Sequence, residues 1–161
     1  MSYFLIKRSD GGVSIVIEGD KPDITRTILE WEKLAKPEYL PIVEIREINA
    51  SDIPGSREFR NAWTDVTSET RIDINCDKAK QIQLEKLRSE RNKKLEELDK
   101  QFMLVLEKDE GAQTTIDEKQ RIIDEKQRLR DITNPLKALN CEGVYNDEAV
   151  LNQIKELSDN E

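Results

Sequence analysis

A seven-residue block repeated back to back near the C-terminus constrains the fold of this chain more than any other feature. Residues 116–122 read Ile-Asp-Glu-Lys-Gln-Arg-Ile, and residues 123–129 read Ile-Asp-Glu-Lys-Gln-Arg-Leu. A seven-residue step nearly completes two helical turns, so Ile116 and Ile123 would face one way on a helix, with Ile122 and Leu129 beside them. In each copy the aspartate precedes the arginine by four residues, which stabilises a helix by about 0.2–0.5 kcal/mol per pair. The block predicts a helix with one apolar seam that packs against another helix.

The partner of this seam is a longer segment upstream, from Asp77 to about residue 109. Its apolar residues recur mostly three or four positions apart, and no glycine or proline interrupts it. Asp77 is the candidate N-cap, and Gly111 is the candidate breaker in the polar link that follows. The repeat helix then runs from about Thr115 to Ile132 and ends before Pro135, as the restriction on the residue preceding proline predicts.

A short link between two amphipathic helices predicts an antiparallel helical hairpin over residues 77–133, with a coiled-coil-like seam. An ion pair of Arg130 with Asp99, or of Arg91 with Asp131, would fix the register of such a hairpin, although exposed pairs contribute only about 0–1 kcal/mol. The alternative is that each of these charges is merely solvated. After the hairpin, residues 134–161 form a tail with one short helix, Glu148–Leu157, for which Asn146 and Asp147 are candidate caps.

The first third of the chain has the pattern of strands. Residues 2–8 and 13–18 are rich in β-branched and aromatic residues, and Ser-Asp-Gly-Gly between them predicts a β-hairpin. A helix is expected over residues 24–35 after Asp23, and a third strand over residues 40–48. The expected fold class is therefore α+β, with a small antiparallel ββαβ domain over residues 1–50, followed by the long helical hairpin and a short C-terminal helix.

Residues 51–76 are predicted to be a linker that ends in a short strand, residues 71–75. Arg57, Arg60 and Trp63 could form a cation–π recognition patch. The alternative, which we weigh more heavily, is that Phe59 and Trp63 anchor a helical turn onto the sheet.

Composition excludes several classes of function. The chain has 161 residues, 37% of them charged and 36% hydrophobic, a net charge of −8 and interleaved acids and bases, so nucleic-acid binding is not expected. No stretch approaches the roughly 20 apolar residues of a membrane span, and a soluble, non-secreted protein without membrane contact is expected. Histidine is absent, Cys76 and Cys141 lack metal-ligand spacing, and no phosphate-binding or nucleophile motif occurs. We therefore expect free thiols, no cofactor, no metal and no enzymatic activity.

Four segments carry a resemblance to a known family. They are, in order, Arg-Glu-Phe-Arg-Asn-Ala-Trp (57–63), Arg-Ile-Asp-Ile-Asn (71–75), Leu-Arg-Ser-Glu-Arg-Asn-Lys-Lys-Leu-Glu-Glu-Leu-Asp (87–99) and Gln-Arg-Leu-Arg-Asp-Ile-Thr (127–133). The chain resembles accessory proteins of tailed bacteriophages, and its C-terminal half is similar to the tail fibre assembly (chaperone-like) proteins. Where that family carries Trp-Thr after Leu-Asp and proline after Leu-Arg-Asp-Ile, this chain has Lys-Gln-Phe and Thr133.

The resemblance implies a role in tail or tail-fibre assembly through helix-mediated contacts with a phage tail or tail-fibre protein, in the cytoplasm of the infected bacterium. One alternative is a permanent subunit of the virion tail whose hairpins bundle in a homo-oligomer, and another is a cellular coiled-coil adaptor. The candidate partner-binding residues are Phe59, Arg60, Trp63, Leu95, Leu98, Phe102, Ile116, Ile123 and Leu129.

Overall fold

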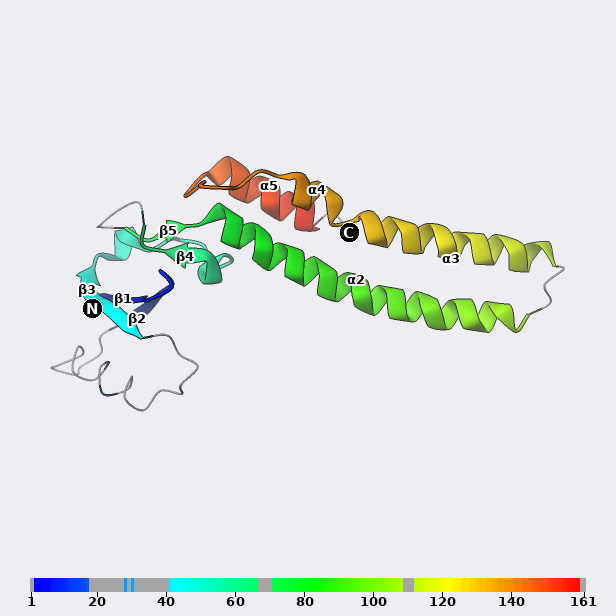
Figure 1. Ribbon diagram of the computed structural model, residues 1–161, viewed down its shortest axis with the longest axis horizontal. Coiled ribbons are helices and arrows are strands. Elements are labelled where there is room, and N and C mark those ends of the chain that lie inside the picture. The colour runs from blue at the N-terminus through cyan, green and yellow to red at the C-terminus, as the bar shows by residue number, and fades with distance from the viewer. Residues whose placement is uncertain are drawn as a thin grey trace. The chain divides into compact units, whose positions relative to one another are not determined.

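The chain is a mixed α+β protein with a small antiparallel sheet followed by helices, as predicted (Figure 1). The computed structural model describes residues 2–17, 28, 30, 41–66, 71–108 and 112–159. It divides the chain into two compact units. The first unit is Met1–Ala79 with Glu142–Glu148, and the second is Lys80–Cys141 with Ala149–Glu161. The predicted linker, residues 51–76, lies within the first unit.

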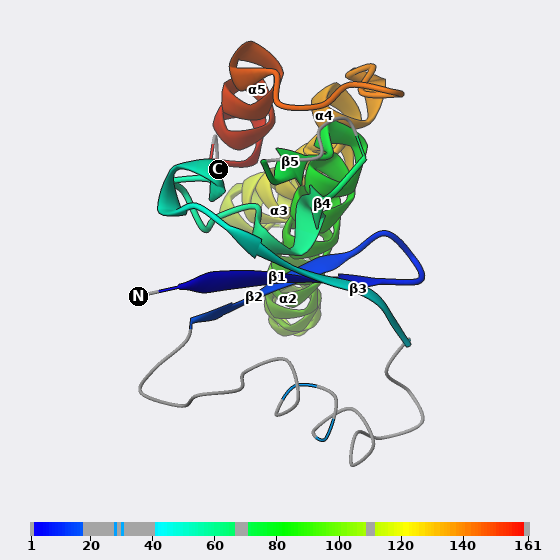
Figure 2. The same ribbon diagram turned by 90° about the vertical axis from the view of Figure 1, so that its left-hand side faces the viewer.

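A three-stranded antiparallel sheet forms the centre of the first unit (Figure 2). Its strands are β1 (Tyr3–Arg8), β2 (Val13–Ile17) and β3 (Ile42–Ile48), in the order β2-β1-β3. The predicted hairpin is confirmed: Arg8 N donates to Gly12 O at 2.9 Å, and Gly11 has φ = 78°, which glycine adopts without the steric cost of a Cβ. The third strand is also confirmed.

Both faces of the sheet carry apolar side chains. Leu5 and Ile48 form one cluster together with Trp63 and Ile72, while Ile6 on the opposite face packs with Ile28. The predicted helix over residues 24–35 lies outside the described residues except at positions 28 and 30. A strand buried on both faces has a nearly continuous apolar pattern rather than an alternating one, and β1 has that pattern.

The segment after β3 folds back onto the Leu5 face. It contains short 3-10 turns, η1 (Ala50–Asp52) and η2 (Arg60–Ala62), and a two-stranded sheet of β4 (Trp63–Thr64) and β5 (Asp73–Ile74). The buried carboxylate of Asp65 holds this segment against the sheet, because its Oδ1 lies 2.7 Å from Arg46 Nη2 and its Oδ2 lies 3.4 Å from Lys7 Nζ. Charge-assisted hydrogen bonds of this kind are about twice as strong as neutral ones.

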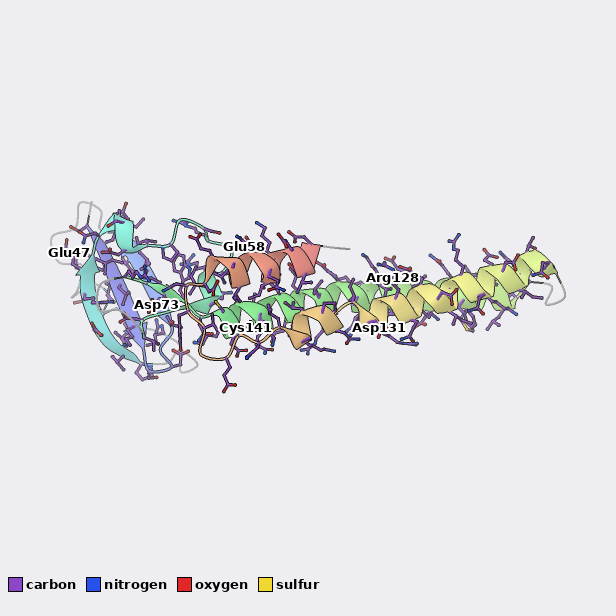
Figure 3. The ribbon with its side chains drawn as sticks, turned by 90° about the horizontal axis from the view of Figure 1, so that it is seen from above. Glu47, Glu58, Asp73, Arg128, Asp131 and Cys141 are labelled. Carbon is purple, nitrogen blue, oxygen red and sulfur yellow. The ribbon has the colours of Figure 1, made fainter. Side chains whose placement is uncertain are left out.

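Residues 142–148 return to the first unit and bind β5. Asn146 has φ = 54°. Its backbone N–H donates to Ile74 O at 3.0 Å, and its side-chain Oδ1 accepts a hydrogen bond from Ile74 N at 2.7 Å. Its Nδ2 donates to Oδ1 of the fully buried Asp73 at 2.6 Å, and Asp73 is labelled in Figure 3. Asn146, a candidate helix cap in the sequence, therefore uses its side chain to bind a strand instead.

Helix α2 (Cys76–Leu106) matches the predicted long helix, but its N-cap is not Asp77. Asn75 Oδ1 accepts a hydrogen bond from Lys78 N at 2.8 Å, the bond that an N-cap makes to the third residue of its helix. Asp77 instead lies in the first turn, where its charge complements the helix dipole.

Three further helices follow: α3 (Gln113–Asp131), α4 (Asn134–Ala138) and α5 (Glu148–Asp159). The bounds of α3 agree with the predicted repeat helix, and Pro135 lies in the first turn of α4, where proline costs no hydrogen bond. The C-terminal helix is confirmed and extends two residues beyond the predicted Leu157.

Candidate functional site

The repeat helix buries one row of residues spaced by seven and exposes the row beside it. Ile122 and Leu129 are buried, Leu129 with only 1% of its surface exposed. Ile116 and Ile123 remain 48% and 47% exposed. The expectation that all four contribute to a buried seam is therefore wrong for Ile116 and Ile123. Adjacent helical residues point about 100° apart, so a contact along one side of α3 covers only one of the two rows.

Two ion pairs join α3 to α2. Lys126 Nζ lies 2.8 Å from Asp99 Oδ1 and 4.7 Å from the centre of the Phe102 ring, so the ammonium group binds a carboxylate and an aromatic face together. Lys108 Nζ lies 2.6 Å from Glu118 Oε2. The prediction that Arg130 forms an ion pair with Asp99 is wrong, because Lys126 takes that place.

The other predicted register pair, Arg91 with Asp131, is also wrong. Arg91 donates to the neighbouring Asn92 side chain. Asp131, labelled with Arg128 in Figure 3, accepts instead from Gln127 and Asn134.

Hydrogen bonds between glutamine and aspartate side chains recur along the charged surface of α3. Glutamine side chains donate to the aspartate four residues later at 2.7–2.8 Å, in the pairs Gln113–Asp117, Gln120–Asp124 and Gln127–Asp131. Arg128 donates to Glu125 from Nε and Nη2, and this side-chain hydrogen bonding lowers the pKa of Glu125. These local bonds stabilise α3.

A group of exposed apolar side chains, here called the apolar tip, flanks the link between α2 and α3. Its members are 39–61% exposed: Met103, Leu104, Leu106, Ile116 and Ile123. They come from the end of α2 and from α3 as far as its middle, and Figure 1 shows the end of α2 and the start of α3 at the same end of the second unit. Exposed apolar side chains that gather on one surface are typical of sites that bind another protein.

The sequence contains a signal for the apolar tip that our reading by helical spacing passed over. Residues 102–106 read Phe-Met-Leu-Val-Leu, and five consecutive helical residues point to all sides of the axis. Contact on one side of α2 therefore cannot cover all five. Val105 is buried and Phe102 is half-buried, whereas Met103 and Leu104 are each 61% exposed.

Most of the remaining candidate partner-binding residues are less accessible than those of the apolar tip. Leu95 and Leu98 of α2 are half-buried in the second unit. Phe59 and Trp63 are buried in the first unit, as the anchoring interpretation requires, and Trp63 packs against Leu5. Arg60 is exposed.

Arg60 and Trp63 line two adjoining clefts in the first unit. A cleft of about 330 Å³ extends from them toward the β1–β2 turn and includes Gly12 and Val13 of that hairpin. A second cleft, of about 180 Å³, extends the other way and is lined by Tyr3, Ile15, Ile17, Ile53 and Arg57 in addition. Together the clefts follow β2, and we call them the β2 groove.

Other kinds of site find little support among the described residues. These contain no cluster of three acidic or cysteine side chains placed to hold a metal ion. None of the described helices is both long and apolar enough to cross a bilayer. Cys76 and Cys141 are free and buried, and burial raises the pKa of the Cys76 thiol, which keeps it protonated and unreactive at neutral pH.

Comparisons with protein-family models, with curated proteins and with solved structures found no match for this chain. The interpretation of its function therefore depends on the surfaces described above and on the resemblance of its motifs.

Proposed function

We propose that this protein is a non-enzymatic factor in bacteriophage tail or tail-fibre assembly that binds a tail protein through the apolar tip. The observation that carries the proposal is the exposure of five large apolar side chains around the α2–α3 link. Each would gain about 25 cal/mol per Å² of apolar surface that a partner covers. The motif resemblance at residues 57–133 supplies the phage context and the class of partner.

We further propose that α2 and α3 act as an antiparallel, coiled-coil-like hairpin that presents the apolar tip. The order of the ion pairs supports this arrangement. Asp99 pairs with Lys126, whereas Lys108, further along α2, pairs with the earlier Glu118 on α3. Pairing that proceeds in opposite directions along two helices is what antiparallel packing requires. Buried residues at seven-residue spacing, Ile122 and Leu129 among them, support a coiled-coil-like contact.

The charged side chain within this contact favours one defined register of the hairpin over the greatest possible stability. Lys126 is the example: only 14% of its side chain is exposed, and its charge is matched by Asp99 and by the Phe102 ring. A half-buried cation that is paired in only one register penalises a shifted register, because a shift would leave its charge unpaired. A fixed register would hold the apolar tip in one arrangement for its partner.

The test is a phage in which the apolar tip is made polar. We would replace Leu104 and Ile116 by serine and compare the phage with wild type and with a matched control, Lys93→Ser and Arg121→Ser, on the exposed polar surface of the same helices. The proposal predicts particles without complete tails or fibres for the tip variant and normal particles for the control. Normal tails and infectivity from the tip variant would refute it.

Mass spectrometry of purified particles and of the lysate distinguishes a transient assembly chaperone from a permanent tail subunit. A protein found in the lysate but not in particles acts transiently, as a chaperone does. A stoichiometric amount in particles makes it a permanent tail subunit. If the tip variant loses self-association in sedimentation while tails assemble normally, the apolar tip binds a second copy of the chain and the proposed partner is wrong.

A further inference from the structure

Within the described residues, the outer edge of β2 has backbone groups that no strand pairs. Strand β2 pairs along its length with β1, and on the other side Gly12, the residue before β2, forms a bridge with Thr64. The Arg8 amide donates to the Gly12 carbonyl, and bonded pairs in an antiparallel ladder recur at every second residue. Ser14 and Val16 therefore face β1, whereas the backbone groups of Ile15 and Ile17 point outward.

The β2 groove lies along the side of this strand that carries Ile15 and Ile17. Its floor is apolar, with Ile15, Ile17 and Ile53 beside the buried Trp63 ring. The Trp63 Nε1 atom is buried and has no hydrogen-bond partner within the described part of the chain. A single edge strand with an apolar groove beside it is the arrangement that proteins use to bind an extended peptide as an added strand.

The part of the β2 groove beside Ile15 and Ile17 is flanked by two arginines, whereas the one acidic lining residue of the groove, Asp10, lies at the β1–β2 turn and accepts a hydrogen bond from Gly12 N. Arg57 and Arg60 both line the groove, both are exposed, and their guanidinium groups make no ion pair or hydrogen bond with any residue that the structure describes. Guanidinium groups bind carboxylates in a bidentate geometry that lysine cannot reproduce.

We propose that the outer edge of β2 binds an extended acidic segment of a partner protein as an added strand, with its carboxylates on Arg57 and Arg60. This inference goes beyond the proposed function, because it uses the first unit and none of the apolar tip. A second copy of the chain fits the groove poorly. Its own β2, Val-Ser-Ile-Val-Ile, supplies no carboxylate for the arginines.

The first test measures binding of a defined peptide to the full-length protein by fluorescence anisotropy. The probe is a blocked, fluorescein-labelled peptide that alternates valine with glutamate and has the length of β2. The Arg57→Gln/Arg60→Gln variant should bind it at least tenfold more weakly, which corresponds to about 1.4 kcal/mol. The matched control is Arg88→Gln/Arg130→Gln on exposed positions of α2 and α3, which should bind like wild type.

The second test separates strand addition from simple charge attraction. Two versions of the peptide carry N-methyl groups on alternate amides, one set in each version. An added strand bonds through every second amide, so one version should lose binding and the other should retain it. Equal binding of both versions, unchanged binding by the Arg57→Gln/Arg60→Gln variant, or no binding by wild type would each overturn the proposal.

The proposal for the apolar tip and the proposal for the β2 groove can be refuted separately. The Leu104→Ser/Ile116→Ser variant should bind the acidic peptide as wild type does. The Arg57→Gln/Arg60→Gln variant should retain its melting temperature, because neither guanidinium group has a partner among the residues that the structure describes. Loss of peptide binding in the variant of the apolar tip would contradict the assignment of binding to β2.

Discussion

Asn146 allows a quantitative test of how residues 142–148 are held against β5 in the first unit. Its replacement by alanine removes the acceptor for Ile74 N, at 2.7 Å, and the donor to Asp73 Oδ1, at 2.6 Å. Leaving a buried group without its partner costs about 1–3 kcal/mol, with the upper end applying to the charged Asp73. Alanine at φ = 54° adds roughly 1 kcal/mol of backbone strain. We therefore expect a loss of about 3–6 kcal/mol, a large part of the stability of a typical domain.

Two variants separate these contributions. Asn146→Gly removes the same hydrogen bonds but adopts a positive φ without strain, so it should be about 1 kcal/mol more stable than Asn146→Ala. Asn152→Ala, at an exposed position of α5, is the control and should stay within about 0.5 kcal/mol of wild type.

Urea unfolding is the appropriate assay, followed both by tryptophan fluorescence and by far-ultraviolet circular dichroism. Trp63 lies in the core of the first unit, whereas most of the helical signal comes from the long helices α2 and α3. Coincident transitions would show that the units unfold together, and separate transitions would assign the loss to the first unit. The reasoning would be refuted if Asn146→Ala were within about 0.5 kcal/mol of wild type, or if the alanine and glycine variants were equally stable.

Three further predictions concern the helices and a buried thiol. Leu129→Ala should lower the free energy of unfolding, measured with urea, by about 2–5 kcal/mol, whereas Ile123→Ala should lower it by less than about 1 kcal/mol because Ile123 is half-exposed. Equal losses would contradict the assignment of the buried row. The buried Thr133 hydroxyl has no hydrogen-bond partner within the described residues, so Thr133→Val should raise the free energy of unfolding by about 1 kcal/mol. A lower melting temperature of this variant would show that the hydroxyl does make a hydrogen bond. Burial raises the pKa of Cys76 in the folded state, so its contribution to stability is complete below the unfolded pKa and is lost as the pH rises through the folded pKa. From about pH 8.5 upward, wild type should therefore lose stability faster than Cys76→Ala, and parallel pH profiles would count against this reasoning.

Elements that depend on local patterns were largely predictable. The hairpin of β1 and β2 follows from Asp-Gly-Gly between two β-branched runs, and α2 and α3 follow from apolar spacing without glycine or proline. Each of these signals lies within a few residues of the structure that it specifies, so it needs no knowledge of distant contacts.

Choices between neighbouring residues were less predictable. Asn75 rather than Asp77 caps α2, and both residue types make good caps. Lys126 rather than Arg130 pairs with Asp99, and both are cations one helical turn apart. The candidate site shows the same limit, because spacing along α3 shows that Ile116 aligns with Ile123 but does not show which way their row faces.

The sequence alone therefore determined the order, type and approximate bounds of most elements. The tertiary structure decided the rest. It showed that Asn146 binds β5 across 72 residues of chain, that Ile116 and Ile123 lie on the exposed row, and that Arg60 lines the β2 groove. The physical reason is that periodicity and turn chemistry specify directions only relative to one element's own axis. Which face is buried depends on where other elements pack, and that is settled by contacts between residues far apart in the sequence.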